Sequence, residues 1–460
     1  MTISDADRAS SPINGDLPVE AGAPSRNSGS LGLYLSRVPE LQQLALDSSF
    51  KGIPLDRTLP LSAVPDQGWN VVCGDLALPV MTLDASAIDA NIDTMRRYCD
   101  RNGVRLAPHG KTTMSPQLFS AQLAAGAWAI TAATPTQASL MRRYGAERIV
   151  LANELIDRGA LTWVASELAR DPRFEFFCLV DEVATACAMD AILSAVSPVR
   201  PLPVFVEVGR QGGRAGTRDV ESACEVAQAV HDCENLELAG IETYEGSLTA
   251  SVDPDALAIL DDLFAMVREA VTAIAARGLF ERREVIVTAG GSMYFDLVIA
   301  ALRDWPEVEP DVRLVLRSGC YVSHDAGVYR RLSPLAGRRA VGEDLILRDA
   351  VRLWGTVLSR PEPDTVIVGL GLRDAPVDRE PPIPLTGFRD GHPHCEMSGT
   401  EVYRVMDQHA FLRIGPDLDI VPGDIINFGV SHPCTAFDKF NFIPLVDDQF
   451  NVVDAILTCF

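Results

Sequence analysis

The sequence predicts an α/β protein in which a (β/α)8 TIM barrel precedes a mostly antiparallel β-domain. Three observations lead to this prediction. From about Arg105 onward, short β-rich runs alternate with longer segments of helical periodicity, which is typical of βα units feeding a parallel sheet. Eight such runs occur within about 220 residues, close to what a closed barrel needs. From about Pro334 the composition shifts to Pro, Gly and β-branched residues, which favours antiparallel strands.

The eight predicted strands can be named one by one. They are VRLA near Arg105, AWAIT near Trp128, RIVLA near Ile149, FEFFCLV near Phe176, PVFVEVG near Phe205, LELAGIETY near Leu238, EVIVTAG near Val285 and VRLVLRSG near Leu314. The segments between them place apolar residues at helical spacing, and several begin at a Ser, Thr or Asp cap and end at Gly. An open doubly wound sheet is the alternative architecture.

The rest of the chain divides into further parts. Residues 1–30 are polar, are rich in Ser, Pro and Gly, and lack the features of a secretion signal, so we expect a disordered tail. Residues 31–100 contain a strand and then a helix that starts near Asp84. We expect the barrel over residues 101–333 and the β-domain over residues 334–460.

Charge and composition limit the classes of partner. Lys and Arg total 40 against 63 for Asp and Glu, which gives a formal charge of -23 and argues against nucleic acid or an anionic membrane. No apolar stretch reaches the roughly 18 residues of a membrane span. The 10 cysteines show no CxxC pair, which suggests reduced thiols in the cytoplasm. A small-molecule substrate is therefore expected.

The segment APHGKTTMSPQL places Lys111 directly after the first predicted barrel strand. Barrels build their active sites at the C-terminal ends of their strands. A lysine held there can be desolvated, which lowers its pKa and leaves a neutral amine able to form a Schiff base with a carbonyl. From position alone, a solvated loop lysine is an equal alternative.

Two later segments favour a cofactor. TAGGSMYF places Gly290, Gly291 and Ser292 after the seventh strand, where we expect them to open a helix, and RSGCYVS places Gly319 and Tyr321 after the eighth. Glycines at such turns let backbone amides converge on an anion, and barrels often bind a phosphate at these loops. A reactive lysine opposite a phosphate-binding turn suits pyridoxal 5'-phosphate (PLP), because PLP carries an aldehyde and a phosphate on one ring.

These segments resemble the D-serine dehydratase and D-threonine aldolase family of fold-type III PLP enzymes, which share the alanine racemase barrel. The resemblance covers the chain from about Leu78 onward and rests on MTLDASAIDANIDTM, RLAPHGKTTMSPQL, EVGRQGGRAG, IETYEGS, TAGGS, RSGCYV and GVSHPCTAFDKF. It implies that Lys111 carries PLP, that Arg214 lies near the PLP ring and that Tyr244 contacts the cofactor. It further implies that the strand before the barrel joins the β-domain and that the enzyme is a head-to-tail homodimer.

A metal site is predicted near the C-terminus. In SHPC, His432 and Cys434 alternate on an extended segment, so both could bind one borderline cation. The resemblance implies a catalytic divalent metal at this pair, with Zn2+ expected and Mn2+ or Mg2+ as alternatives. The motif GHPHCEM is an alternative metal site, because it places three possible ligands close together in a predicted loop, namely His392, His394 and Cys395. The sequence leaves their role and that of His409 open.

The resemblance favours a dehydratase of a D-configured β-hydroxy amino acid, because His-x-Cys resembles the dehydratases and His-x-Asp is typical of the aldolases. A D-threonine-type aldolase is the runner-up. A PLP carrier without a β-domain, a racemase and a barrel hydrolase without PLP fit less well. Departures at Gly110, Met114 and Ser318 suggest a side branch with its own substrate.

Overall fold

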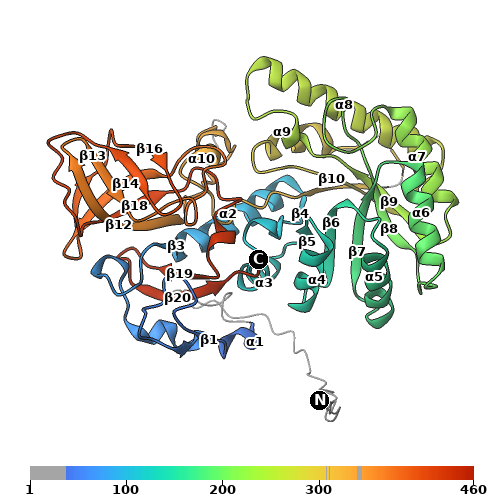
Figure 1. Ribbon diagram of the computed structural model, residues 1–460. Coiled ribbons are helices and arrows are strands. Elements are labelled where there is room, and N and C mark those ends of the chain that lie inside the picture. The colour runs from blue at the N-terminus through green and yellow to red at the C-terminus, as the bar shows by residue number, and fades with distance from the viewer. Residues whose placement is uncertain (1–37, 307, 310, 339–343) are drawn as a thin grey trace, which may run out of the picture. The chain divides into compact units, whose positions relative to one another are not determined.

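The chain folds as the sequence predicts, with a parallel barrel followed by an antiparallel β-domain (Figure 1). The structure, a computed structural model, describes residues 38–306, 308–309, 311–338 and 344–460. The predicted tail, residues 1–30, lies outside the described residues. The barrel strands are β4 (Arg105–Leu106), β5 (Ile130–Ala132), β6 (Arg148–Glu154), β7 (Glu175–Val180), β8 (Leu202–Glu207), β9 (Leu236–Glu242), β10 (Glu284–Ala289) and β11 (Asp311–Leu316).

The eight strands close into a barrel. Their order is β4-β11-β10-β9-β8-β7-β6-β5, and every pair along this path is parallel. A parallel bridge between His109 and Thr131 joins the two outer strands, and the Thr131 amide donates to the Pro108 carbonyl at 2.9 Å. This closure excludes the open doubly wound sheet.

Helices connect the barrel strands and lie around them (Figure 1). They are α3 (Pro116–Ala124), α4 (Pro135–Arg143), α5 (Arg158–Arg170), α6 (Val183–Ser194), α7 (Val220–Asp232), α8 (Pro254–Ala276) and α9 (Phe295–Leu302). The helix before the barrel, α2 (Ala85–Asn102), begins where the sequence predicts. Asp84 caps it by accepting a hydrogen bond from the Ala87 amide at 2.9 Å.

Alternation along the strands separates an inner core from an outer one. Phe177 on β7 and Phe205 on β8 stack in the inner cluster, with ring centroids 5.2 Å apart. Their neighbours Phe176 and Cys178 belong to the larger cluster that includes the helices. Side chains therefore fill the barrel, and the space for a site lies at its mouth.

The β-domain is antiparallel, as predicted. Its strands are β12 (Val351–Glu362), β13 (Thr365–Val368), β14 (Ile383–Arg389), β15 (His392–Glu396), β16 (Glu401–Val405), β17 (Ala410–Arg413), β18 (Ile425–Gly429), β19 (Phe442–Val446) and β20 (Val452–Leu457). The main path is β15-β14-β18-β12-β13-β17-β16. β3 (Val80–Asp84) pairs antiparallel with β12 and parallel with β19, so the strand before the barrel joins this sheet, as the resemblance implies.

Short elements complete the two parts of the fold. Near the beginning of the described chain lie α1 (Pro39–Gln42), β1 (Ala45–Leu46) and β2 (Leu59–Pro60). Their apolar side chains share a cluster with Trp354 of β12, so this segment packs against the β-domain. Between β11 and β12 lies α10 (Val328–Leu332).

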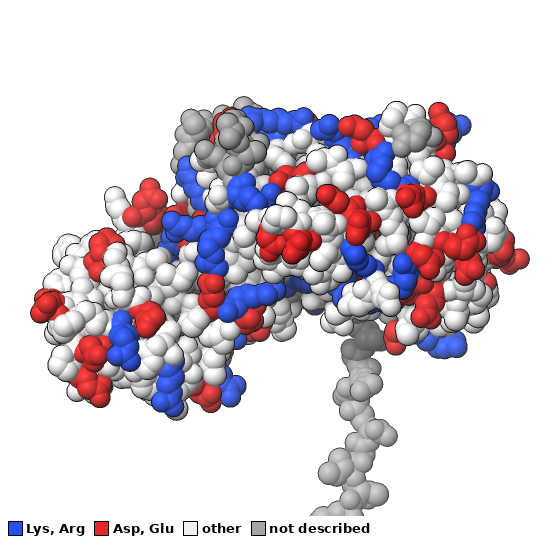
Figure 2. Space-filling model, turned by 90° about the horizontal axis from the view of Figure 1, so that it is seen from above, with Lys and Arg blue, Asp and Glu red and all other residues white. Residues whose placement is uncertain are grey.

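The surface carries charges of both signs despite the net charge of -23. Figure 2 shows acidic and basic side chains interspersed over one face of the molecule. Within the described part of the chain, every helix is too short or too polar to cross a lipid bilayer.

Candidate active site

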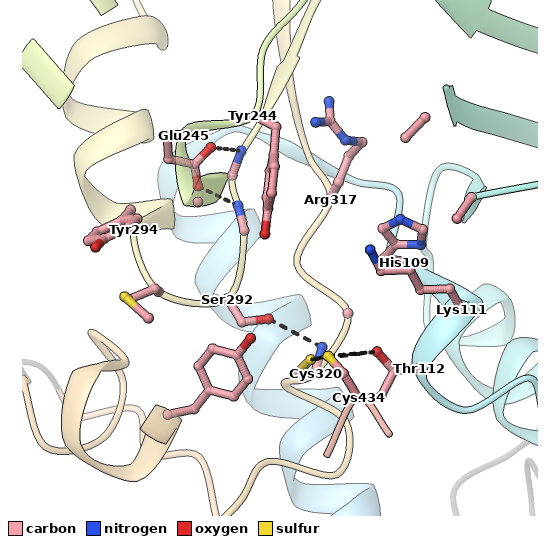
Figure 3. Close-up of a pocket in the computed structure, with 18 of the residues that line it drawn as sticks. His109, Lys111, Thr112, Tyr244, Glu245, Ser292, Tyr294, Arg317, Cys320 and Cys434 are labelled. Atoms are coloured by element: carbon pink, nitrogen blue, oxygen red, sulfur yellow. Dashed lines mark hydrogen bonds between the residues drawn. The ribbon is translucent and has the colours of Figure 1, made fainter. Parts of the chain in front are cut away.

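A cavity of about 300 Å³ opens at the carboxyl ends of the barrel strands (Figure 3). This volume lies within the range of cofactor and small-molecule sites. Loops after most barrel strands form its wall, and the segment after β18 adds residues from the β-domain. Nine of the ten predicted site residues line it, namely Lys111, Arg214, Tyr244, Gly290, Gly291, Ser292, Gly319, His432 and Cys434.

Lys111 enters the cavity from a short 3-10 turn, Gly110–Thr112, that follows β4. The chain contains three lysines, Lys51, Lys111 and Lys439. All three are described, and Lys111 alone lines the cavity. Its side chain is exposed, whereas the sequence led us to expect a desolvated amine.

His109 stands beside Lys111 as a neutral imidazole. Burial, together with the charges of Lys111, Arg317 and Arg214, lowers the pKa of His109 well below its usual value. Its Nδ1 lies 3.1 Å from the Thr131 carbonyl oxygen, so this nitrogen carries the proton and donates it. The other ring nitrogen, Nε2, is therefore able to accept a hydrogen bond from a bound molecule.

The glycine turn after β10 differs from the predicted phosphate cradle. Gly290 adopts φ +95°, and a Cβ there would lie 2.8 Å from Leu316 Cδ2. The amides of Gly290 and Gly291 donate to the carboxylate of Glu245, at 3.2 and 2.6 Å. Helix α9 begins only at Phe295, so the glycines precede the helix and do not open it. Two amides expected to bind a phosphate already have a partner.

Ser292 and Gly319 remain as candidate phosphate contacts on this wall. Ser292 Oγ accepts from the Cys320 amide at 3.2 Å, which leaves its own proton for a ligand. A Cβ on Gly319 would lie 2.3 Å from the His109 carbonyl oxygen, so only glycine permits this approach. Ser318 donates to the carbonyl oxygens of the glycine turn at 2.9 and 3.1 Å and ties that turn to β11.

A buried ion pair on the wall was missed by the sequence analysis. Arg317, after β11, pairs with Glu242 of β9 and donates at 3.0 Å to both Thr288 Oγ1 and the Thr243 carbonyl. The two charged residues lie 75 positions apart, so no short motif reports them. Only their places at strand ends could have indicated a role.

A second group of side chains gathers around His432 and Cys434. His432 Nδ1 lies 2.6 Å from Asp378 Oδ2, and Thr435 donates to the other carboxylate oxygen at 2.9 Å. Burial alone would raise the pKa of Asp378, but these hydrogen bonds outweigh it and lower that pKa. The ionised carboxylate fixes the imidazole. His432 Nε2 lies 3.4 Å from the Tyr329 hydroxyl, which also lines the cavity.

Cys434 contacts a second thiol that the sequence analysis did not consider. Cys320 Sγ lies 3.4 Å from Cys434 Sγ, and Thr112 Oγ1 lies 3.6 and 3.7 Å from the two sulfurs. The hydrogen bond from Cys434 lowers the pKa of Cys320, and the same contact raises the pKa of Cys434. Thiol and imidazole donors suit a borderline cation such as Zn2+. In the chain as described, no three His, Cys, Asp or Glu side chains already surround one point in a metal-binding arrangement.

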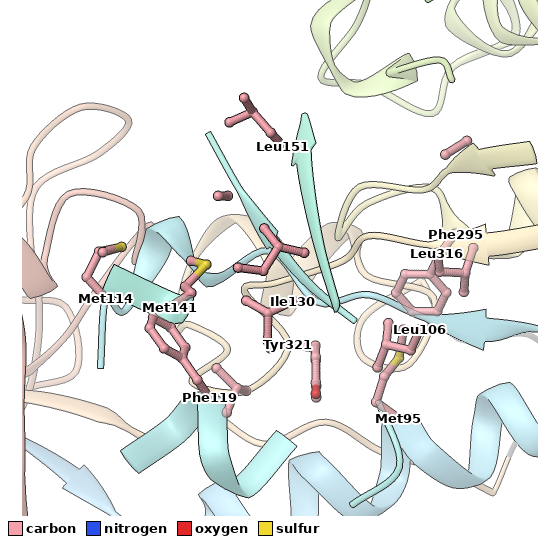
Figure 4. Packing of buried hydrophobic residues seen from close by; sticks show 14 of the residues in the cluster. Met95, Leu106, Met114, Phe119, Ile130, Met141, Leu151, Phe295, Leu316 and Tyr321 are labelled. Atoms are coloured by element: carbon pink, nitrogen blue, oxygen red, sulfur yellow. The ribbon is translucent and has the colours of Figure 1, made fainter. Parts of the chain in front are cut away.

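Tyr321 does not line the cavity, which corrects the predicted cofactor contact. Its side chain is 2% exposed, and Gln122 Nε2 donates to its hydroxyl at 3.0 Å. Figure 4 shows the ring among apolar side chains that include Met95 and Leu106. Tyr321 is therefore a core residue, because its ring leaves the turn toward the hydrophobic cluster.

The competing histidine motif lies in a strand and not in the predicted loop. His392, His394 and Cys395 belong to β15, which pairs with β14, and they do not line the cavity. His394 Nε2 instead lies 2.9 Å from Asp419 Oδ2. His409 is exposed in the connection between β16 and β17, so it is neither a cavity residue nor a core residue.

Comparison with known proteins gives two family matches. Residues 83–306 match the family described as the N-terminal domain of alanine racemase, and residues 350–446 match the family described as a putative serine dehydratase domain. The 3-hydroxy-D-aspartate aldolase of Paracoccus denitrificans (strain Pd 1222) is 28% identical over 360 residues, which are 76% of this chain and 85% of that protein. The D-threonine aldolase of Arthrobacter sp. is 25% identical over 381 residues, which are 80% of this chain and 89% of that protein.

A solved structure shares the fold. The D-threo-3-hydroxyaspartate dehydratase from Delftia sp. HT23 has a TM-score of 0.66 at 23% identity, covering 84% of this chain and 99% of that one. Two variants of a dehydratase with this name are also similar, each with a TM-score of 0.67. One replaces a histidine by alanine, and the other, in a metal-free form, replaces a cysteine two positions later. His432 and Cys434 have the same spacing.

Proposed function

Because the chain belongs to the D-serine dehydratase and D-threonine aldolase family of fold-type III PLP enzymes, we propose that it is a PLP- and divalent-metal-dependent dehydratase. Its substrate would be a D-configured β-hydroxy amino acid such as D-serine. Loss of water would give an enamine, and hydrolysis of the enamine would return the water and give a 2-keto acid and ammonia. One observation carries the proposal. The single lysine on the cavity wall, Lys111, shares that cavity with His432 and Cys434.

The residues that line the cavity support PLP as the cofactor. Gly290 and Gly319 stand where any side chain would collide with a neighbour, so the backbone itself forms the wall. Lys111 would carry the cofactor, and the Ser292 hydroxyl would contact its phosphate. When bound, PLP supplies an electron sink for charge that develops on the substrate Cα. Lys111, once freed as a neutral amine, would take the proton from Cα.

The thiol and imidazole pair fits a divalent metal through the chemistry of its donors. His432 and Cys434 would hold the ion, which supplies a Lewis acid beside the β-oxygen of the substrate. Asp378 keeps the imidazole in place. Burial raises the pKa of Tyr329 well above its usual value, so its hydroxyl stays protonated and could donate a hydrogen bond to the leaving oxygen.

Retro-aldol cleavage to glycine and an aldehyde is the second candidate. It would use the same residues, with the proton leaving the β-hydroxyl while Cα keeps its hydrogen. The names of the two aldolases compared above favour this reaction. The histidine and cysteine spacing shared with the dehydratase variants favours dehydration, which we therefore place first.

Product analysis separates the two reactions. The holoenzyme would be given D-serine, D-threonine and 3-hydroxy-D-aspartate, with and without EDTA, and keto acid, ammonia and glycine would be assayed separately. We expect keto acid and ammonia in equal amounts, and loss of both in EDTA. Glycine without ammonia would replace the dehydratase by the aldolase.

The assembly and its surroundings are part of the proposal. We propose a cytoplasmic homodimer that binds neither nucleic acid nor membranes. Sedimentation of the holoenzyme at twice the chain mass of 49.7 kDa would support the dimer. A mass of one chain at micromolar concentration would contradict it.

A further inference from the structure

Cys320 occupies an unusual place for a buried cysteine. Cys178 and Cys224 lie in the hydrophobic core, as buried thiols usually do. Cys320 is 5% exposed, yet it lines the cavity and contacts polar partners, the thiol of Cys434 and the hydroxyl of Thr112. Figure 3 shows the two sulfur atoms next to each other in the cavity. The proposed function gives a role to Cys434 and leaves Cys320 without one.

The spacing of the two sulfurs suits ligands of one cation. Two thiolates bound at about 2.3 Å to a tetrahedral Zn2+ lie about 3.8 Å apart. Cys320 Sγ and Cys434 Sγ are 3.4 Å apart, so an adjustment of a few tenths of an ångström would suffice. Thr112 Oγ1 is within hydrogen-bonding reach of both sulfurs and could stabilise thiolates there.

We propose that Cys320 is a third protein ligand of the metal, together with His432 and Cys434. This inference rests on the proposed function, because it concerns the same metal. Two cysteines and one histidine form a ligand set known from catalytic zinc sites that keep one position open. Since the three side chains do not yet surround one point among the described residues, binding requires His432 Nε2 to exchange its contact with Tyr329 for the ion.

The third ligand would change the chemistry of the site. A second thiolate makes the ligand set softer, so Zn2+ and Co2+ would be preferred over Mn2+ and Mg2+. It also leaves a four-coordinate ion with one open position where a pair of ligands would leave two. One open position is enough for the β-oxygen of a substrate.

Cobalt provides a test that does not depend on activity. Co2+ would be titrated into the metal-free, reduced, PLP-loaded protein, and the near-ultraviolet thiolate-to-cobalt absorbance would be recorded for the wild type, Cys320→Ser and Cys434→Ser. Cys187→Ser is the matched control, because Cys187 is exposed on α6, away from the cavity. We expect one Co2+ per chain, a band reduced to about half in each site variant, and an unchanged band in the control.

The outcomes distinguish the inference from the proposed function. If Cys434→Ser removes the whole band and Cys320→Ser leaves it intact, Cys434 is the only thiolate ligand and the inference is wrong, while the proposed function stands. If the wild type binds no Co2+ or Zn2+, the metal part of the proposed function fails as well. Should Cys320→Ser not fold by circular dichroism, X-ray absorption of the zinc-loaded wild type decides, because two sulfur neighbours support the inference and one overturns it.

Discussion

The two sides of the cavity are built in different ways. On the barrel side, several polar groups have partners within the protein, as Glu245 shows by accepting from the glycine turn and Arg317 by pairing with Glu242. On the β-domain side, His432 Nε2 has a contact of 3.4 Å with Tyr329, and the thiol of Cys434 faces another thiol. The glycine turn and the ion pair of the barrel side are therefore held by contacts within the protein, whereas we expect the β-domain side to reach its final geometry only when the proposed ion binds.

This difference predicts that the two sides can be damaged separately. Strand ends and glycine turns fix the barrel side, so variants there other than those at Cys320 should affect the cofactor and leave the metal in place. The donors of the second side come from a connection after β18, and Asp378 positions one of them. Changes there should affect the metal and leave the colour of the cofactor unchanged.

The largest effect is expected at Lys111. Lys111→Ala removes both the amine that would carry PLP and the base at Cα, so kcat should fall by at least about 10³-fold. The visible absorbance of the bound cofactor should disappear, while zinc content measured by mass spectrometry stays the same. Lys439→Ala, which changes a lysine outside the cavity wall, is the control. Full activity in Lys111→Ala would disprove the proposed mechanism.

A smaller effect is expected at Asp378, which contacts the proposed metal ligand His432. Asp378→Asn weakens the contact that orients His432, and such partners of metal ligands typically contribute about 10–100-fold to affinity. We expect the zinc dissociation constant to rise within that range, with an unchanged cofactor spectrum. Asp419→Asn is a matched control, because Asp419 contacts His394 at 2.9 Å outside the cavity. Equal loss of zinc in both variants would show that Asp378 has no special role.

The glycine turn should respond more weakly still. Glu245→Ala leaves the amides of Gly290, which is buried, and of Gly291, which is half-buried, without their acceptor. A buried unsatisfied group costs roughly 1–3 kcal/mol. If part of this cost loosens the turn, the PLP dissociation constant should rise about 10-fold, as measured by fluorescence titration of the apoenzyme. Glu245→Gln keeps one acceptor oxygen, so its PLP dissociation constant should lie between those of the wild type and Glu245→Ala. Tighter PLP binding in Glu245→Ala would mean that the carboxylate competes with the phosphate.

Local patterns in the sequence were sufficient for the fold. Helical and strand periodicities depend on neighbouring residues, and they located all eight barrel strands and the start of α2 at Asp84. The change in composition near Pro334 marked the β-domain for the same reason. The cavity residues followed because barrel topology brings strand ends together, and the resemblance supplied His432 and Cys434.

Contacts between distant segments could not be predicted in this way. Cys320 and Cys434 are separated by 114 positions, and the acceptor of the glycine turn, Glu245, precedes it by 45. Neither pair has a spacing that a motif could report. The cofactor contact predicted for Tyr321 was wrong. Its neighbours Gly319 and Cys320 line the cavity, but the sequence does not show that the Tyr321 ring points away from the cavity into the core.

The smallest predicted effect concerns a buried acid on the barrel side. Glu207, on β8, is 3% exposed, and burial, assisted by Glu242 and Glu154, raises its pKa from 4.5 to about 9. Because the folded state then binds the proton more tightly than the unfolded state, its contribution to stability is complete below about pH 4.5 and is lost as the pH rises toward 9. Arg214 Nη2, 3.6 Å away, acts in the opposite direction and lowers this pKa, but by less than burial raises it.

Glu207→Gln has a neutral side chain at every pH, so the stability of this variant should depend less on pH than that of the wild type. We expect the free energy of unfolding to fall less between pH 5 and pH 9 in the variant than in the wild type. Denaturant titrations at both pH values would measure it. Glu269→Gln removes an exposed carboxylate from α8 and is the control. If the free energy of unfolding falls equally in all three proteins, Glu207 is charged in the folded barrel. The barrel side of the cavity would then hold an ionised carboxylate that the contacts within the protein do not neutralise.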